Sequence, residues 1–153
     1  MPTTRASRTI SASPQDLWEL IVDPHHLPRW WPRVTRVESV EADAFTEVLI
    51  ASSGKVVRAD FKLLAADEQA RLLKWAQHIE GTPFARVLKS AETEVRLQAA
   101  PAVGSTVGHS TEVLIELRQT PRGPFSRLGG RMIRRAASAT IEEALDGLER
   151  IVG

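Results

Sequence analysis

The chain has 153 residues, and 42% of them are hydrophobic, which is enough to build a full core in a single domain. It has no cysteine, which excludes disulfides and thiolate metal sites, and its net charge of +1 does not favour nucleic acid as a partner. No uninterrupted run of about 18 apolar residues occurs, so no stable membrane anchor is expected. We therefore predict one domain over residues 1–153, in the reducing environment of the cytoplasm.

The first part of the chain predicts a strand followed by two short helices. Residues Thr3 to Ile10 alternate in the manner of an edge strand. Ser13-Pro14-Gln15-Asp16 then supplies a hydroxyl cap, a proline for the first helical position and an acid in the first turn, which together predict a helix. Asp23-Pro24 ends this helix, and His25 to Trp31 is expected to form a second short helix or turn between prolines.

The middle of the chain has the period of two that is typical of antiparallel strands. Between Lys55 and Ala65, for example, apolar side chains alternate with charged ones, as in a strand with one face buried. Including the segment that starts at Arg33, we expect about six strands here. The others are Phe45–Ser52, Lys55–Ala65, Arg71–Glu80, Phe84–Ala99 and Thr106–Arg118.

The last stretch, Pro124 to Val152, predicts one long helix, because its apolar residues recur at steps of three and four. About 28 residues would span about 40 Å, so the apolar face needs a wide partner. A curved sheet is the expected partner. The residues of this face are Phe125, Leu128, Met132, Ala136, Ile141, Ala144, Leu145, Leu148, Ile151 and Val152.

This order of elements, with Ser13-Pro14-Gln15-Asp16-Leu17-Trp18, Trp30-Trp31-Pro32 and Leu145-Asp146-Gly147-Leu148 at the corresponding places, resembles the polyketide cyclase/dehydrase-type members of the START-like superfamily. The resemblance covers essentially the whole chain. It implies an α+β helix-grip fold, in which a curved antiparallel sheet of six to seven strands wraps around the C-terminal helix and encloses a cavity. It implies little about function, since the superfamily includes lipid carriers, hormone receptors, ring-closing enzymes and chaperone regulators.

Small residues on the long helix, from Gly129 and Gly130 to Ala136, Ala137 and Ala139, leave volume for a ligand cavity or for close packing against the sheet. Trp30 and Trp31 would point about 100° apart on a helix, so we expect either one under the small helices and the other near the entrance, or both as lids on the core. The expected ligand-binding residues share an inward orientation. They are Trp31, Val57, Phe61, Leu73, Trp75, Gln77, Val95, Thr111, Val113, Ile115, Met132 and Ala136.

Few residues qualify for catalysis. A histidine base with an arginine that holds an oxyanion would suit ring closure or dehydration, which makes His109 and Arg86 the candidates. His25-His26 beside Asp23 is not expected to bind a metal, because adjacent side chains splay apart and no third ligand follows at a suitable spacing. No cofactor is expected.

Three functions remain open from the sequence. The first is a carrier or sensor that binds a hydrophobic small molecule, such as a lipid or polyketide, between the helix and the sheet. The second is a polyketide cyclase, aromatase or dehydratase, which requires at least two convergent polar groups deep in the cavity. The third is a protein-interaction module, which requires a collapsed cavity and an exposed apolar patch. The oligomeric state, monomer or weak dimer, also stays open.

Overall fold

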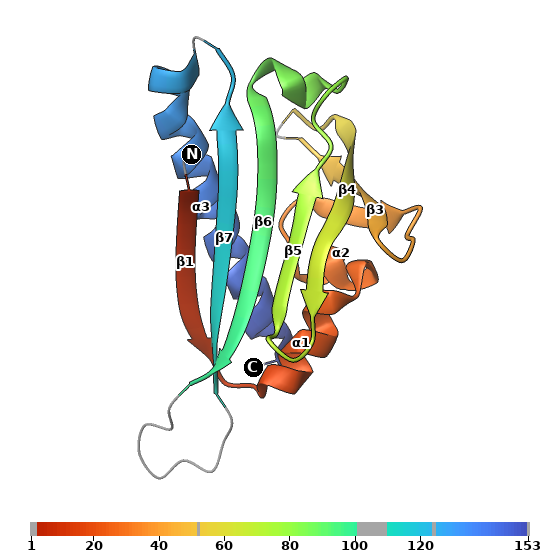
Figure 1. Ribbon diagram of the computed structural model, residues 1–153, viewed down its shortest axis with the longest axis vertical. Coiled ribbons are helices and arrows are strands. Elements are labelled where there is room, and N and C mark those ends of the chain that lie inside the picture. The colour runs from red at the N-terminus through yellow and green to blue at the C-terminus, as the bar shows by residue number, and fades with distance from the viewer. Residues whose placement is uncertain (1–2, 52, 101–109, 124, 153) are drawn as a thin grey trace.

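The computed structural model describes residues 3–51, 53–100, 110–123 and 125–152, with the side chains of all these ranges except 125–129. A seven-stranded antiparallel sheet has the order β1-β7-β6-β5-β4-β3-β2. The long helix α3 lies behind this sheet in the view of Figure 1, along β1 and β7. The strands are β1 (Thr3–Ile10), β2 (Val34–Glu38), β3 (Ala44–Ile50), β4 (Val56–Asp67), β5 (Leu72–Gln77), β6 (Leu88–Ala99) and β7 (Thr111–Pro121).

The helices are α1 (Pro14–Val22), α2 (Leu27–Trp30) and α3 (Phe125–Val152), with short 3₁₀ turns η1 (Pro24–His26) and η2 (Pro83–Arg86). The α1 helix begins as predicted: the Ser13 hydroxyl accepts a hydrogen bond from the Asp16 N–H at 3.1 Å, and Pro14 occupies the first helical position. No helix among the described residues is both long and apolar enough to cross a membrane.

The core lies between the sheet, α1, α2 and the C-terminal half of α3. From α3 it receives Ile141, Ala144, Leu145 and Leu148, all fully buried. The helix-grip arrangement implied by the resemblance is therefore confirmed, including the two short helices after the first strand.

Ion pairs join the edge strand β1 to α3. The Arg8 guanidinium lies 2.7 Å from the Glu142 carboxylate, 2.5 Å from Asp146 and 3.7 Å from Glu149. The hydrogen bond with Asp146 is the main cause that raises the pKa of Arg8 above its usual value. Burial lowers this pKa, and the hydrogen bond with Glu142 raises it further. Arg8 thus lies on the helix-facing side of its strand and holds the first strand against the last helix.

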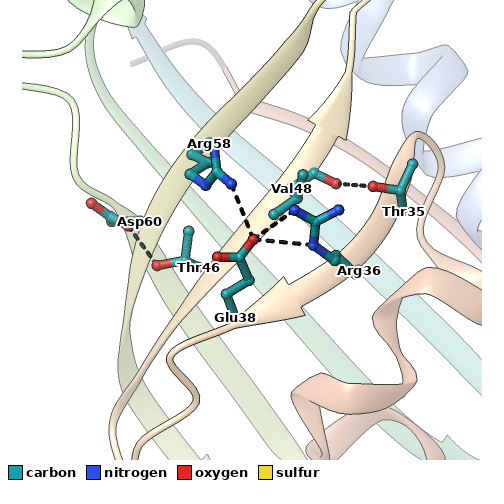
Figure 2. Close-up of polar contacts among 7 residues, drawn as sticks. All are labelled: Thr35, Arg36, Glu38, Thr46, Val48, Arg58 and Asp60. Carbon is teal, nitrogen blue, oxygen red and sulfur yellow. Dashed lines mark hydrogen bonds and ion pairs between the residues drawn. The ribbon is translucent and has the colours of Figure 1, made fainter.

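The opposite edge strand, β2, is tied to its neighbours on the outer face of the sheet (Figure 2). Glu38 accepts hydrogen bonds from Arg36 at 3.1 Å and from Arg58 at 3.3 Å. The register shifts between Val34 and Arg36, where Thr35 donates to the carbonyl of Val48 at 3.0 Å. This irregularity places Val37, rather than a charged neighbour, opposite Glu47 of β3.

The structure corrects three sequence-based expectations. The segment expected as one strand from Phe84 begins instead with η2, because Pro83 favours a turn, and β6 starts only at Leu88. The last strand, expected over Thr106–Arg118, continues to Pro121, and residues 106–109 of the expected strand lie outside the described part of the chain. Met132, expected inward, is 75% exposed, because Ile133 and Ala137 face the cavity and the helix turns Met132 about 100° away from Ile133.

Candidate ligand cavity

A cavity of about 410 Å³ lies between the sheet and the first half of α3. Strands β3 to β7, the turn η2, the segment after α2 and α3 all contribute to its wall. Most of the lining is apolar. The apolar lining residues are Trp31, Pro32, Leu49, Ile50, Ala51, Val57, Phe61, Trp75, Phe84, Val87, Leu88, Ala91, Leu117, Ile133, Ala136 and Ala137.

Two of these residues mark the mouth of the cavity. Ile50 is 44% exposed and Val87 is 42% exposed, yet both side chains line the cavity. Large apolar side chains at such exposure lose favourable burial unless something covers them. Apolar side chains therefore form part of the entrance as well as most of the interior.

An aromatic wall continues inward from the entrance. The ring of Trp31 meets that of Trp75 edge to face, with centroids 5.8 Å apart, and meets Trp30 in the same way at 5.4 Å. Trp30 is only 2% exposed and belongs to the core, whereas Trp31 lines the cavity. Because the two neighbouring rings lie nearly perpendicular, one anchors the segment and the other faces the ligand space.

Glu47 is a carboxyl group in the cavity wall, although it is only 2% exposed. Its neighbours along the strand are Phe45 and Leu49, and its partners across the sheet are Val37 and Ala59. None of these side chains can donate a hydrogen bond, and Oε2 of Glu47 has no partner. Burial alone raises the pKa of Glu47 to about 8, so its carboxyl group is mostly protonated at neutral pH.

Other polar groups share the wall with Glu47. The side-chain nitrogen Nε2 of Gln77 is buried without a hydrogen-bond partner. Thr93, Gln119 and Thr140 line the same cavity. A mainly apolar space with a few inward-facing polar groups is the usual make-up of a small-molecule site.

Six of the twelve predicted ligand-binding residues line this cavity: Trp31, Val57, Phe61, Trp75, Gln77 and Ala136. Met132 points to solvent instead. The remaining five lie in the core. Leu73 faces a second, smaller cavity of about 60 Å³, and Val95, Thr111, Val113 and Ile115 are completely buried away from the larger one.

Of the two catalytic candidates, only Arg86 belongs to the described residues. His109 lies outside them. Arg86 is exposed at the end of η2 and is not part of the lining, although Phe84 and Val87 on either side of it are. The sequence analysis missed Glu47. Alternation places it on one strand face with Phe45 and Leu49, but alternation alone does not show that this face borders the cavity.

The sequence matches a protein family over residues 1–153, and this family is described as polyketide cyclase / dehydrase and lipid transport. No protein of curated function matches the chain. Among solved structures, XoxI from Bacillus cereus is 16% identical with a TM-score of 0.76 and covers 99% of this chain and 96% of its own. A START superfamily protein from Mycobacterium smegmatis is 14% identical with a TM-score of 0.75, over 98% of this chain and 96% of its own.

A third similar structure is the di-domain ARO/CYC protein BexL from the BE-7585A biosynthetic pathway. It is 16% identical with a TM-score of 0.76, over 98% of this chain and 46% of BexL. At such identities the likeness establishes the fold alone. With the family match over its whole length and the fold it shares with these structures, the chain belongs to the polyketide cyclase/dehydrase and lipid transport family and has a START-like fold.

Proposed function

We propose that this protein is a carrier or sensor that binds a hydrophobic small molecule in the cavity between the sheet and α3. The observation that carries the proposal is the cavity itself, about 410 Å³ in volume and lined mainly by apolar side chains. The proposal includes one domain over residues 1–153, a cytoplasmic location and no role for nucleic acid. The family description, which joins cyclases with lipid transport, is consistent with such a ligand.

The affinity follows from the size of the site. A ligand that buried roughly 300 Å² of apolar surface would gain roughly 7 kcal/mol at about 25 cal/mol per Å². The loss of translational and rotational freedom offsets part of this gain. Polar contacts and the exclusion of water from the aromatic wall add to it. We therefore expect dissociation constants on the order of micromolar for a lipophile that fits.

Native mass spectrometry of freshly purified protein, followed by solvent extraction, tests the proposal. A stoichiometric lipophilic mass, or thermal stabilisation by members of a panel of lipids, quinones and polyketides, would support it. A bare protein mass together with no stabilisation by any member of the panel would contradict it. The protein-interaction alternative required a collapsed cavity, which the observed volume disfavours.

A cyclase or dehydratase is the second candidate, and Glu47 is the observation that favours it. A carboxyl group with a pKa of about 8 can both give and take a proton near neutral pH, as general acid–base catalysis requires. Incubation with a poly-β-ketone thioester, with product masses read for loss of water, tests this function. Turnover that disappears in Glu47→Gln while thermal stability persists would support it, and turnover that persists in that variant would remove Glu47 from the chemistry.

A further inference from the structure

Two buried polar groups in the cavity wall have no hydrogen-bond partner. These are Oε2 of Glu47 and Nε2 of Gln77. An unpaired polar group that is shut off from water destabilises a fold, so most such groups in proteins are paired. Because both groups border the same cavity, a ligand in that cavity is the partner available to both.

No cation pairs with Glu47 among the described residues. The charged residues that line the cavity with it are Arg33 and Glu92, and Glu92 lies 3.5 Å from Lys74. The lining residues of η2 and α3 carry no charge; they are Phe84, Val87, Ile133, Ala136, Ala137 and Thr140. Burial therefore acts unopposed on the Glu47 carboxyl group and keeps its proton in place near neutral pH.

A protonated carboxyl group and a primary amide are both hydrogen-bond donors. Resting on the proposed binding function, we propose that the ligand is a lipophile with a carbonyl oxygen, which accepts hydrogen bonds from Glu47 and Gln77 inside the cavity. Both residues lie on the helix-facing side of the sheet, where Glu47 pairs with Ala59 and Gln77 pairs with Phe61 of the intervening strand β4.

An ammonium ligand is the main competing partner for a buried carboxyl group, and two observations disfavour it. An ammonium group has no lone pair to accept a hydrogen bond from Gln77, whose nitrogen would stay unpaired. Arg33 also lines the cavity, so a cation would meet a like charge there. A carbonyl oxygen satisfies Gln77 and is compatible with Arg33.

Three probes with the same arrangement of non-hydrogen atoms test the proposal. They are 2-acetylnaphthalene, a ketone; 2-isopropylnaphthalene, in which a methyl group replaces the oxygen; and 1-(2-naphthyl)ethylamine, an ammonium ion at neutral pH. Their dissociation constants are measured by equilibrium dialysis against the full chain and its variants. Circular dichroism checks that each variant is folded.

The expected affinities separate the contribution of the hydrogen bond from the contribution of apolar contacts in the cavity. At about pH 6, Glu47→Leu weakens ketone binding about tenfold, the loss of one good hydrogen bond, and leaves the hydrocarbon within about twofold. Glu47→Gln retains a donor and keeps the ketone affinity. Gln77→Leu is a second variant with the same expected selectivity. Glu80→Gln is the control, an exposed glutamate that is not part of the lining, and it leaves both affinities within about twofold.

Raising the pH provides an independent readout. At about pH 9.5 the wild type loses about tenfold in ketone affinity as Glu47 loses its proton, while Glu47→Gln does not. Equal losses of ketone and hydrocarbon in Glu47→Leu would overturn the proposal, and so would tightest binding of the ammonium probe with its loss in Glu47→Gln. If none of the three probes binds, the ligand assignment fails, whereas the proposed binding function is decided separately by the native mass and the thermal panel.

Discussion

Gly147 of α3 lies directly against the backbone of Trp30. A Cβ atom at Gly147 would lie 2.5 Å from the carbonyl oxygen of Trp30 and 2.8 Å from its Cα. Only a residue without a side chain permits this approach of α3 to α2. Since the ring of Trp30 contacts that of Trp31, which lines the cavity, the contact at Gly147 also sets the position of the aromatic wall.

Gly147→Ala is therefore expected to destabilise the protein, although alanine favours helices more than glycine does. The overlap is with backbone atoms, which cannot rotate away, so we expect a net loss of about 1–3 kcal/mol in the free energy of unfolding. Urea denaturation measures this loss. Gly130→Ala in the same helix is the control: its Cβ would meet no atom within 4 Å, so it should be neutral or stabilising. Equal effects of the two variants would show that the Trp30 contact is unimportant.

Glu47 should make stability fall as pH rises. Its pKa is about 4.5 when unfolded and about 8 in the native protein, so between these values the native state holds a proton that the unfolded chain has released. This contribution to stability is complete below pH 4.5, decreases across the window from 4.5 to 8 and is lost above pH 8.

Glu47→Gln removes this titration, so its stability relative to the wild type should increase by about 1 kcal/mol per pH unit across that window. Unfolding by urea at several pH values gives the difference. The exposed Glu80→Gln is the control, and its difference from wild type should stay flat over the same window. Parallel curves for Glu47→Gln and wild type would mean that Glu47 is ionised in the native state.

The ion pairs of Arg8 should stabilise the attachment of β1 to α3. Arg8→Met keeps an apolar stem but removes the charge that faces Glu142, Asp146 and Glu149, and we expect a loss of about 1–2 kcal/mol at low salt. In about 1 M NaCl the loss should shrink, because salt screens exposed charges. Arg5→Met, an exposed position on the opposite face of β1, should change stability by less than about 0.5 kcal/mol. If Arg8→Met loses the same free energy of unfolding at low and high salt, the packing of the Arg8 side chain rather than its charge is responsible.

Filling the cavity should abolish binding without unfolding the protein. Ala136→Trp places a large ring in the space that the helix leaves, and we expect the affinity for 2-isopropylnaphthalene to fall at least about tenfold. Ala139→Trp, an exposed position three residues further along that is not part of the lining, should bind normally. Equilibrium dialysis compares the two. Unchanged binding by Ala136→Trp would place the ligand elsewhere.

The sequence predicted the elements of this fold well, because each has a local physical cause. The cap at Ser13 and the alternation from Thr3 to Ile10 depend on neighbours in the chain, and the structure has a helix and a strand there. Met132 shows the limit of this reasoning. Its spacing matches the apolar residues of α3, but tertiary packing decides which side of the helix faces the cavity, and there Ile133 and Ala137 face it instead.

The site was only partly predictable for a similar reason. Alternation in β3 separates Phe45, Glu47 and Leu49 from Thr46, Val48 and Ile50, but both sets are largely apolar. Composition therefore does not say which set faces the cavity. Pairing across the hairpin decides it, since Glu47 lies opposite Ala59, on the apolar face of β4. Which residues of each strand border the cavity also depends on how strongly the sheet curves, and no local sequence pattern in this chain indicates that curvature.

The uneven attachment of α3 has a consequence for motion. Its C-terminal half is fixed by Gly147, by the ion pairs of Arg8 and by four fully buried side chains, whereas residues 131–136 are mostly exposed and border the cavity. Local opening should therefore start in this part of the helix, and its amide hydrogens should exchange faster than those near Leu145. A molecule bound in the cavity would add contacts to Ile133 and Ala136. Its binding should therefore slow amide hydrogen exchange in the N-terminal half of α3 and leave the C-terminal half unchanged.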